Sequence, residues 1–527
     1  MKPVLNFILA GLAGLVFACQ ASQPSQESAS PYSDPLAEYF DKNLKPFYHG
    51  VASGDPLTDR VILWTRVTPD VAQPVEVQWQ ISESPTFEQI TQKGSFTTDS
   101  TRDYTVKVDV EGLQPGTKYY YRFLALEATS ITGETRTAPT GDQEQLKFGF
   151  VSCSNYQTGY FNAYKKLAER EDLNAVVHLG DYIYEYKAGK YADTTLHRNH
   201  LPDKEIITLA DYRTRYAQYH VDPDLRAAHQ KHPFIVIWDD HELANNTYNG
   251  GAQNHQPEEG DWNERFHAAR QAYFEWLPMR ERKDQKIYRT LKFGNLAELV
   301  LLDTRAEGRS KQVKNMQDPA YLDSTRTMLG QEQYNWFTNT LTASEAQWKI
   351  VGNQVILAGV NVAFQKPENP KYMDMWDGYP FEKTKLIDFL GEQQNVLFVT
   401  GDFHSSLAME VTQDPLNTQA YDPKTGKGAV AAEFVVQSIS APNYDFYMSR
   451  DTVKVIEEKH RDPAYNPHMK HANLSDHGYV ILDIQPEEVT AEWWYVDDLL
   501  HPSDKIRVGK RLKVKNGSSL LEEASVQ

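Results

Sequence analysis

The sequence predicts an α/β fold preceded by a small β-sandwich, because two different patterns follow one another along the chain. Residues 50–138 hold short β-type runs separated by Gly, Pro, Asp or Ser, as in an antiparallel sandwich. From residue 146 onward, apolar runs alternate with helix-like stretches such as 162–170 and 261–277, as in a sheet covered by helices. Pro139-Thr-Gly-Asp142 interrupts both patterns and marks a boundary near residues 139–145.

Size and composition indicate a globular protein with room for about three or four average domains or two larger ones. The chain has 527 residues, of which 40% are hydrophobic and 12% aromatic, and a disordered chain cannot carry so much apolar surface. The 54 basic and 72 acidic residues give a net charge of −18. Such a charge repels a phosphate backbone unless the basic residues cluster, and the sequence has no such cluster. We therefore expect no specific nucleic-acid partner.

An export signal is predicted at residues 1–18. A charged start is followed by an uncharged apolar run from Val4 to Phe17, which is shorter than the roughly 20 residues that span a membrane. Leu15-Val-Phe-Ala-Cys19 resembles a bacterial lipobox, in which the cysteine is lipidated. An ordinary cleaved signal or a single membrane anchor is the alternative. We expect a lipoprotein anchored through Cys19 in the bacterial cell envelope, periplasmic or outer-membrane, and a monomer.

These patterns divide the rest of the chain into four segments. Residues 19–45 are polar and rich in Pro and Ser, which suits a flexible tether. The β-sandwich is expected at 46–140, with strands at 61–67, 75–81, 104–110 and 118–124. We expect its aromatic residues, Trp79 and Tyr119 to Tyr121, to form its core. The α/β domain is expected at 145–505, and the charged tail 506–527 is left unassigned.

Polar residues follow the apolar strands of the second domain at the point where each strand ends. Five such segments occur: Ser152-Cys-Ser-Asn155, Gly180-Asp-Tyr-Ile-Tyr184, Asp239-Asp-His-Glu242, Gly352-Asn-Gln354 and Gly401-Asp-Phe-His404. In a layered α/β fold, polar groups just beyond the carboxyl ends of buried strands meet in one crevice. We therefore expect these segments to form one site.

The residue types of these segments favour a metal site, because buried charges are tolerated mainly when they are paired or bound to metal. Cys153, Tyr184 and His404 are softer ligands, which suit a transition metal such as iron. Asp240 and Asp402 offer only oxygen ligands, which suit calcium, magnesium or manganese. Asp181 has two oxygens and can bridge both. Two metals about 3.5–4 Å apart can bind the attacking and leaving oxygens of a phosphoryl displacement. The predicted reaction is metal-assisted phosphoester hydrolysis.

The same segments resemble a known family. Gly180-Asp-x-x-Tyr184, Asp240-His-Glu242 and Gly401-Asp-x-His404 resemble the ordered blocks of the calcineurin-like metallophosphoesterases, nearest the purple acid phosphatase branch. Cys153, Asp240 and Asp402 stand where that family usually has Asp, Asn and His. With the segments 47–56, 62–66, 238–242 and 302–305, these replacements resemble the PhoD-like alkaline phosphatases over nearly all of the mature chain.

The resemblance implies a four-layer sandwich of two sheets between helices, an N-terminal Ig/fibronectin-like sandwich, and a site with Fe³⁺ and Ca²⁺ that acts on phosphate mono- or diesters outside the cytoplasm. The implied iron ligands are Cys153, Asp181, Tyr184 and His404, and the implied calcium ligands are Asp181, Asp240 and Asp402. His241 matches the family's acid, which protonates the leaving oxygen. Asn155 and Arg305 are implied phosphate contacts, and Asn353 or Gln354 stands where the family commonly has a His.

Several of these residues have a structural alternative. Cys153 on its own would be read as a small buried hydrophobe, Tyr184 as a packing residue, and Arg305 as the partner of a buried carboxylate. Strand alternation would direct only one of Asp239 and Asp240 into the site. Four other histidines are expected to be structural or surface residues: His178, His220, His229 and His232.

A function of another class competes with catalysis, namely a surface-anchored binding lipoprotein whose metal is structural. Structural metal sites tend to be coordinatively closed and to lack a spare acid. Here His241 is left over after the ligands are counted, which favours an enzyme. A phosphomonoesterase and a phosphodiesterase would use the same metal pair, so the sequence does not separate them.

Overall fold

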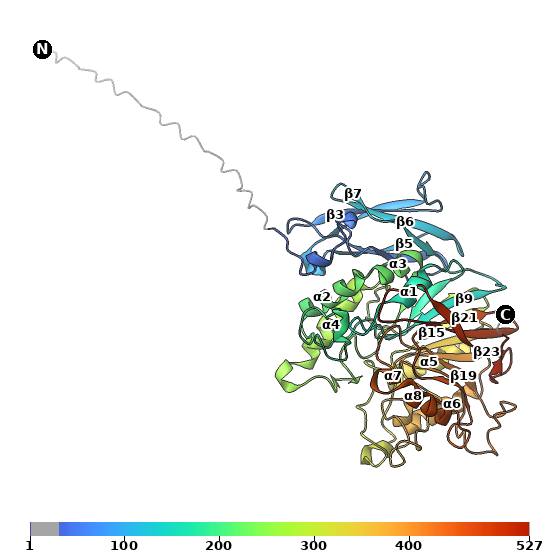
Figure 1. The fold of residues 1–527 in the computed structure, drawn as a ribbon. Helices are drawn as coiled ribbons and strands as arrows, with labels where there is room; N and C mark the ends of the chain where they lie inside the picture. The colour runs from blue at the N-terminus through green and yellow to red at the C-terminus, as the bar shows by residue number, and fades with distance from the viewer. Residues whose placement is uncertain (2–30, 526–527) are drawn as a thin grey trace.

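The computed structural model describes residue 1 and residues 31–525 (Figure 1). The export segment and Cys19 lie outside the described residues. In the part that is described, no helix combines the length and the apolar character that crossing a membrane requires.

The described part of the expected tether is packed onto the fold, which corrects the prediction for residues 31–45. It contains the 3-10 turns η1 (Ala37–Tyr39) and η2 (Lys42–Leu44). Leu36 is fully buried, and Asp34 forms a buried ion pair of 2.8 Å with Arg66. A polar composition alone did not reveal these two anchoring contacts.

A ten-stranded sheet and a seven-stranded sheet form the body of the molecule. In spatial order the larger sheet contains β24 (Glu522–Glu523), β23 (Ile506–Lys515), β22 (Glu488–Val496), β21 (Gly478–Ile484), β9 (Leu146–Val151), β10 (Ala175–His178), β11 (Pro233–Val236), β1 (Val51–Gly54), β2 (Arg60–Arg66) and β5 (Thr105–Glu111). The smaller contains β14 (Arg289–Phe293), β15 (Ala297–Leu301), β16 (Trp348–Asn353), β17 (Val396–Thr400), β19 (Ala431–Val435), β18 (Ser406–Val411) and β20 (Met469–Asn473). The central strands β9 to β11 and β15 to β17 are parallel within their sheets.

Eight α-helices occur among the described residues: α1 (Asn162–Ala168), α2 (Leu209–His220), α3 (Pro223–Lys231), α4 (Trp262–Trp276), α5 (Gly330–Ala343), α6 (Pro380–Leu390), α7 (Tyr444–Tyr447) and α8 (Arg450–His460). Local sequence sets several of their starts. Asp261 caps α4 by accepting from the backbone N–H groups of Asn263 and Glu264. Five further 3-10 turns are η3 (Ser100–Arg102), η4 (Thr194–Leu196), η5 (Pro257–Glu259), η6 (Pro319–Leu322) and η7 (Trp376–Gly378).

Alternating side chains place each sheet between a shared core and a helical layer. In β17, Leu397 and Val399 belong to the core that also contains the ten-stranded sheet, whereas Phe398 packs with α5 and α6. In β9, the ring of Phe148 meets Phe293 of the other sheet, with centroids 4.8 Å apart. A Cβ on the next residue, Gly149, would lie 2.9 Å from Leu167 of α1. The two sheets therefore face one another, and α1 covers the far side of β9.

The N-terminal strands form a sandwich that is continuous with the second domain. A separate sheet of β4 (Gln92–Thr98), β3 (Val75–Ser82), β6 (Lys118–Ala125), β7 (Ala128–Thr129) and β8 (Gly133–Arg136) shares a core with β1, β2 and β5. Tyr119 and Tyr121 are buried in that core, and Trp79 packs against it, whereas Tyr120 alternates to the other face of β6 and is not part of the core, contrary to the expectation. However, β1 pairs in parallel with β11, so one layer of the sandwich extends the ten-stranded sheet. The predicted boundary at 139–145 therefore does not separate two independent sheets.

The C-terminal segment left unassigned by the sequence forms the strand β23 and the short strand β24 over its described residues. The strand β23, red in Figure 1, pairs with β22 on one side and with β24 on the other, at the edge of the ten-stranded sheet. Leu512 and Val514 are buried, while Lys513 pairs with Glu488 of β22 at 2.8 Å. Basic residues alternate with apolar ones along 506–515, so this charged tail is an amphipathic strand.

Candidate metal centre and active site

The polar strand ends come together in one cluster. Among the described residues, three groups have ligand atoms within 4.8 Å of one another: Cys153 with Asp181 and His404, Asp181 with Asp240 and His241, and Asp239 with Asp240 and Asp402. Shared Asp181 and Asp240 join the groups into one. The segments after β9, β10 and β11 come from the larger sheet, and the segment after β17 comes from the smaller sheet. The site thus lies where the carboxyl ends of strands from two facing sheets meet.

The backbone turns sharply at four of the predicted ligands. Cys153, Asp181, Asp402 and His404 have φ angles of 59°, 56°, 61° and 63°, in the left-handed region that non-glycine residues rarely adopt. Hydrogen bonds hold the first two turns together, since Cys153 N–H donates to the carbonyl of Gly180 at 3.1 Å. Backbone strain of this kind clusters at functional sites. The fold therefore maintains an unfavourable backbone at four residues that the sequence predicts to be metal ligands.

The soft ligand group contains one imidazole with a defined tautomer. His404 Nδ1 donates to the carbonyl of Pro442 at 2.7 Å, which leaves the Nε2 lone pair for a cation or a donor. Tyr184 O–H lies 3.3 Å from this Nε2 and 3.0 Å from Oδ2 of Asp181. Burial lowers the pKa of His404 to about 4, so the ring is neutral, and burial raises the pKa of the Cys153 thiol well above its usual value.

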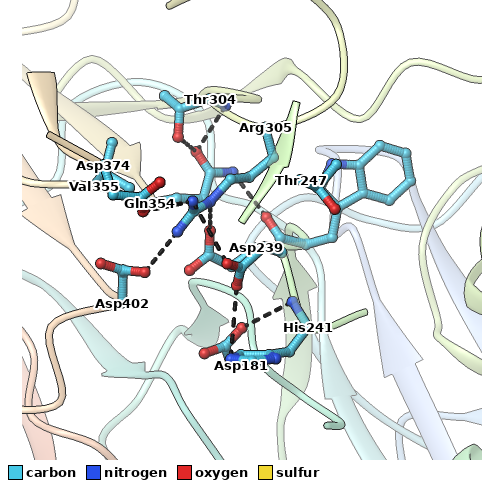
Figure 2. Close-up of polar contacts among 12 residues, drawn as sticks. Asp181, Asp239, His241, Thr247, Thr304, Arg305, Gln354, Val355, Asp374 and Asp402 are labelled. Carbon is cyan, nitrogen blue, oxygen red and sulfur yellow. Dashed lines mark hydrogen bonds and ion pairs between the residues drawn. The ribbon is translucent and has the colours of Figure 1, made fainter. Parts of the chain in front are cut away.

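The oxygen-rich group surrounds Arg305, as Figure 2 shows. The guanidinium donates to Asp402 at 2.6 Å, to Asp374 at 2.8 Å and to Asp239, and it lies 3.6 Å from Asp240. The Arg305 side chain is fully buried and is absent from the lining of the pocket described below. In this structure Arg305 pairs with carboxylates, as the structural alternative expected, and its implied role as a phosphate contact stays a prediction.

Three buried oxygens in this region have no hydrogen-bond partner among the described residues: Asp239 Oδ2, Asp240 Oδ1 and Asn353 Oδ1. Such acceptors are costly unless a donor or a cation satisfies them, so the residues fit a metal site. Asp239 and Asp240 both face the cluster because β11 ends at Val236, before them, and strand alternation no longer applies. The amide oxygen of Gln354 accepts from Thr304, and its amide nitrogen donates to the carbonyls of Trp238 and Leu302. Of the two neighbours, only Asn353 therefore has a side-chain oxygen without a partner.

Burial acts on the pKa values of all these carboxylates, and nearby positive charges oppose it. Burial raises the pKa of Asp181 well above its usual range and that of Asp402 to about 6. Burial also acts on Asp240, but the positive charges of Arg305 and His241 outweigh it and lower its pKa. Arg305 alone thus leaves some of these acids favouring the protonated form, and an added cation would favour their charged forms.

The chain resembles known proteins along most of its length. The family model described as PhoD-like phosphatase matches residues 148–493, and the model of its N-terminal domain matches residues 35–139. The chain belongs to the PhoD-like phosphatase family. Alkaline phosphatase D of Bacillus subtilis strain 168 is 37% identical over 486 residues, which cover 88% of this chain and 79% of that protein. A solved structure of PhoD matches with a TM-score of 0.82 and 34% identity, covering 92% of this chain and 94% of the other.

This PhoD-like phosphatase therefore hydrolyses phosphoesters, and His241 lies within its carboxylate cluster. His241 Nδ1 lies 2.6 Å from Oε2 of Glu185, and Nε2 lies 3.9 Å from Oδ1 of Asp240. Burial lowers the pKa of His241, but Asp181, Glu185 and Asp240 outweigh it and raise the pKa well above 6.5. The ring is thus held as a proton donor beside the ligand groups.

Sequence reasoning gave no role to three acidic residues of the cluster, although Glu242 belongs to one of the segments expected to form the site. Glu242 accepts backbone hydrogen bonds from Asp181, Tyr182 and Asp239 at 2.6–3.0 Å and so ties the segments after β10 and β11 together. Glu185 holds His241, and Asp374 pairs with Arg305. A usable signal existed for two of them, because Glu185 and Glu242 each directly follow a predicted site residue.

A pocket of about 470 Å³ adjoins the cluster, and Tyr184, His241 and His404 contribute to its lining. Asn155 also lines it; its Nδ2 donates to the carbonyl of Tyr191 at 3.1 Å, which leaves one amide N–H. The pocket therefore opens directly onto the residues predicted to carry the chemistry.

The four histidines expected to be structural or surface residues are all buried and lie outside the ligand groups: His178, His220, His229 and His232.

Proposed function

We propose that this phosphatase is an exported, metal-dependent hydrolase of phosphate monoesters or diesters in which His241 is the acid. The observation that carries the proposal is the continuous ligand cluster from Cys153 to Asp402, with a protonatable histidine beside it and a pocket above it. We also propose that the two sheets and their helices form the four-layer sandwich of the metallophosphoesterases.

Iron would be held by the soft group: Cys153, Asp181, Tyr184 and His404. Thiolate, phenolate and imidazole ligands suit a transition metal. The His404 tautomer supports this assignment, because Nε2 carries the free lone pair. Burial alone disfavours ionised Cys153 and Tyr184, and a bound cation reverses that preference.

Calcium would be held by Asp181, Asp240 and Asp402, whose carboxylate oxygens are the ligands that hard cations prefer. The unpartnered oxygens of Asp240 and Asn353 support this site. Asn353 joins the candidate ligands, whereas Gln354 does not, since its amide is fully engaged by Thr304 and by two backbone carbonyls.

When bound, two such cations neutralise phosphoryl oxygens and lower the pKa of a water at the site. The remaining steps belong to the chain. Glu185 fixes the ring of His241 through Nδ1, so the Nε2 proton is available for the leaving oxygen. Asn155 lines the same pocket and keeps one amide N–H for a phosphate oxygen. Closely spaced acids also repel an anionic substrate unless cations are bound, which makes turnover metal-dependent.

The alternative, a binding lipoprotein with a structural metal, is not favoured. It gives no use to His241, to the Glu185 contact or to the open pocket beside the ligands. Export and lipidation at Cys19 remain part of the proposal and rest on the sequence pattern of residues 1–19. We further propose that the mature protein acts as a monomer.

The decisive experiment measures metal content and hydrolysis together, on purified protein lacking residues 1–19. Metal content is determined by mass spectrometry, and the substrates are para-nitrophenyl phosphate and bis-para-nitrophenyl phosphate at alkaline pH, with and without calcium. Bound iron and a calcium-dependent rate support the proposal, and the ratio of the two rates separates monoesterase from diesterase. Protein without metal that stays inactive on both substrates after iron and calcium are added contradicts it.

A further inference from the structure

Six of the thirteen residues that line the pocket above the cluster are Tyr or Phe. Tyr184, Tyr186 and Tyr191 come from the segment after β10; the rings of Tyr184 and Tyr186 both pack against that of His241, and the Tyr191 ring packs against that of Tyr186. The Tyr186 ring lies 5.2 Å from that of His241 and 4.9 Å from that of Tyr191, measured between centroids. A continuous aromatic surface thus leads from the proposed acid to the pocket mouth.

A second aromatic group completes the lining. Phe403 lies between the predicted ligands Asp402 and His404, and Tyr444 and Tyr447 belong to α7. The hydroxyl of Tyr444 lies 3.1 Å from that of Tyr372, whose ring packs edge-on against Phe403. These contacts fix the inner rings, whereas Tyr447 is 62% exposed and Tyr191 is 47% exposed. Two aromatic side chains therefore remain open to solvent at the pocket.

The lining is also unusual in its charge. Of the described residues that form the pocket wall, none is Lys, Arg, Asp or Glu, although the chain as a whole is 24% charged. Lys190 packs over the Tyr186 ring, with Nζ 4.2 Å from its centroid, but does not line the pocket. His241 aside, a second phosphate or a carboxylate on the substrate would find no cationic side chain in this wall.

We propose that this pocket is the subsite for the ester arm of the substrate and that it selects an arm ending in an uncharged aromatic ring. The inference rests on the proposed function, because it takes the phosphoryl group to sit at the neighbouring cluster. Ring faces attract other planar rings by stacking and edge contacts beyond simple burial. Exposed tyrosines at an opening on the catalytic cluster are suited to that contact and serve no core.

The experiment compares phosphonates that are not hydrolysed and that differ only in the arm. Isothermal titration calorimetry on the metal-loaded enzyme measures Kd for methylphosphonate, benzylphosphonate and cyclohexylmethylphosphonate at one alkaline pH. The last two probes have arms of similar size, and only one of these arms is planar and aromatic. We expect benzylphosphonate to bind about tenfold more tightly than methylphosphonate, and cyclohexylmethylphosphonate to lose most of that advantage.

Substitutions of Tyr191 and Tyr447 test whether these two side chains cause the tighter binding of benzylphosphonate. Tyr191→Ala and Tyr447→Ala should each reduce the benzyl advantage several-fold and leave the Kd of methylphosphonate unchanged, whereas Tyr191→Phe and Tyr447→Phe should keep it. Both side chains are exposed, so truncation should not unfold the protein. Phe381→Ala is the matched control, because Phe381 is 46% exposed on α6 and does not line this pocket.

Two results would overturn the inference. One is equal affinity for the benzyl and cyclohexylmethyl probes, which would make the pocket merely apolar. The other is an unchanged benzyl advantage in both alanine variants. Failure of the proposed function gives a different result: methylphosphonate itself would not bind, and the para-nitrophenyl substrates would not be hydrolysed.

Discussion

Glu185 lies 2.6 Å from Nδ1 of His241 through its Oε2, and the carboxylate is fully buried. Its other oxygen accepts from the backbone N–H of Asn245 and from the side chain of Asn254. Glu185 is therefore fixed by two contacts from outside the ligand cluster, and it fixes the imidazole in turn. This arrangement makes it a positioning residue for the proposed acid.

Two substitutions of Glu185 should separate the effect of its negative charge on the pKa of His241 from its effect on the orientation of the His241 ring. Glu185→Gln keeps an oxygen for Nδ1–H but removes a negative charge that raises the pKa of His241, so that pKa should fall. The alkaline limb of the kcat/KM profile should then move to lower pH, because His241 loses its proton earlier. Glu185→Ala should lower kcat by about 10- to 100-fold, as is typical for loss of an orienting partner.

The pH profiles of kcat/KM check this prediction, and Glu205→Gln serves as the control. Glu205 lies nearby and also accepts from Asn254, but it pairs with Arg265 rather than with His241. Identical alkaline limbs in wild type and Glu185→Gln would show that Glu185 does not act through His241.

Substitutions of the proposed ligands and of the proposed acid should all lower activity but should differ in the metal content of the protein. Cys153→Ala and His404→Ala should lose iron and activity together, because each removes a proposed ligand whose loss the remaining residues do not replace. His241→Ala should retain iron and lose turnover by about 10²- to 10⁴-fold, the usual contribution of a general acid. Metal analysis and steady-state rates on the same preparations test both. Full activity in Cys153→Ala would remove the thiolate from the site.

Removing Arg305 should make the fold more dependent on calcium. Its guanidinium is the positive charge shared by Asp239, Asp374 and Asp402, and a buried carboxylate left without its partner is strongly destabilising. A divalent cation should then stabilise Arg305→Met more than wild type, since it binds the folded state and offsets the same repulsion. Tm values in chelator and in calcium measure this difference.

A matched control for that experiment is Arg213→Met. Arg213 forms a 2.7 Å ion pair with Glu275 between α2 and α4, away from the cluster. Its loss should lower Tm equally in chelator and in calcium. If calcium raises the Tm of Arg305→Met by no more than that of wild type, Arg305 and the cation do not share these carboxylates.

The sequence predicted the local parts of the fold better than their assembly. The expected runs 61–67, 75–81, 104–110 and 118–124 correspond to β2, β3, β5 and β6, because alternation is a property of neighbouring residues. The pairing of β1 with β11 joins Ser53 to Pro233, and nothing in either segment specifies a partner so distant along the chain. The amphipathic strand 506–515 was concealed by its high charge.

The same distinction holds for the site. Residue types at strand ends pointed to Cys153, Asp181, Tyr184, Asp240, Asp402 and His404, and the structure brings all six together. The contacts around Arg305 could not be predicted from the sequence, because one of them involves Asp374, which lies in a loop with no strand-end motif. Glu185 and Glu242 act through backbone and imidazole contacts that only the folded chain creates.

The free energy of unfolding should decrease as the pH is lowered, because several histidines are buried in their neutral form. Burial lowers the pKa of His178 and His220 to about 3, whereas an unfolded histidine titrates near 6.5. Between these values the unfolded chain binds more protons, so the stabilisation is complete above about pH 6.5 and is lost as pH falls toward 3. At pH 5 each residue should cost about 2 kcal/mol relative to pH 7.5.

Urea unfolding at pH 7.5 and 5.0, in chelator, measures that difference. His220→Gln removes one of these groups, so it should narrow the gap between the two pH values by about 2 kcal/mol, whatever its effect on stability at pH 7.5. A gap as wide as that of wild type would mean that His220 does not contribute to the acid sensitivity.

The N-terminal region should be required for the second domain to fold. A fragment of residues 145–525 lacks β1, β2 and β5, which exposes the buried edge of β11 as an unpaired strand. Trp64 of β2 is fully buried in the main core, and its Nε1 donates to the carbonyl of Glu275 in α4 at 2.8 Å. We therefore expect the fragment to aggregate, and Trp64→Ala in the full chain to lose about 3–5 kcal/mol in urea unfolding.

Trp79→Ala is the matched control, because Trp79 lies in the separate sheet and is only partly buried against the sandwich core. Trp79→Ala should lower the free energy of unfolding clearly less than Trp64→Ala does, since the ten-stranded sheet stays intact. A soluble, monomeric 145–525 fragment with the Tm of the full chain would show that the pairing of β1 with β11 adds nothing to the second domain. The sandwich would then be an appended module rather than an extension of the catalytic sheet.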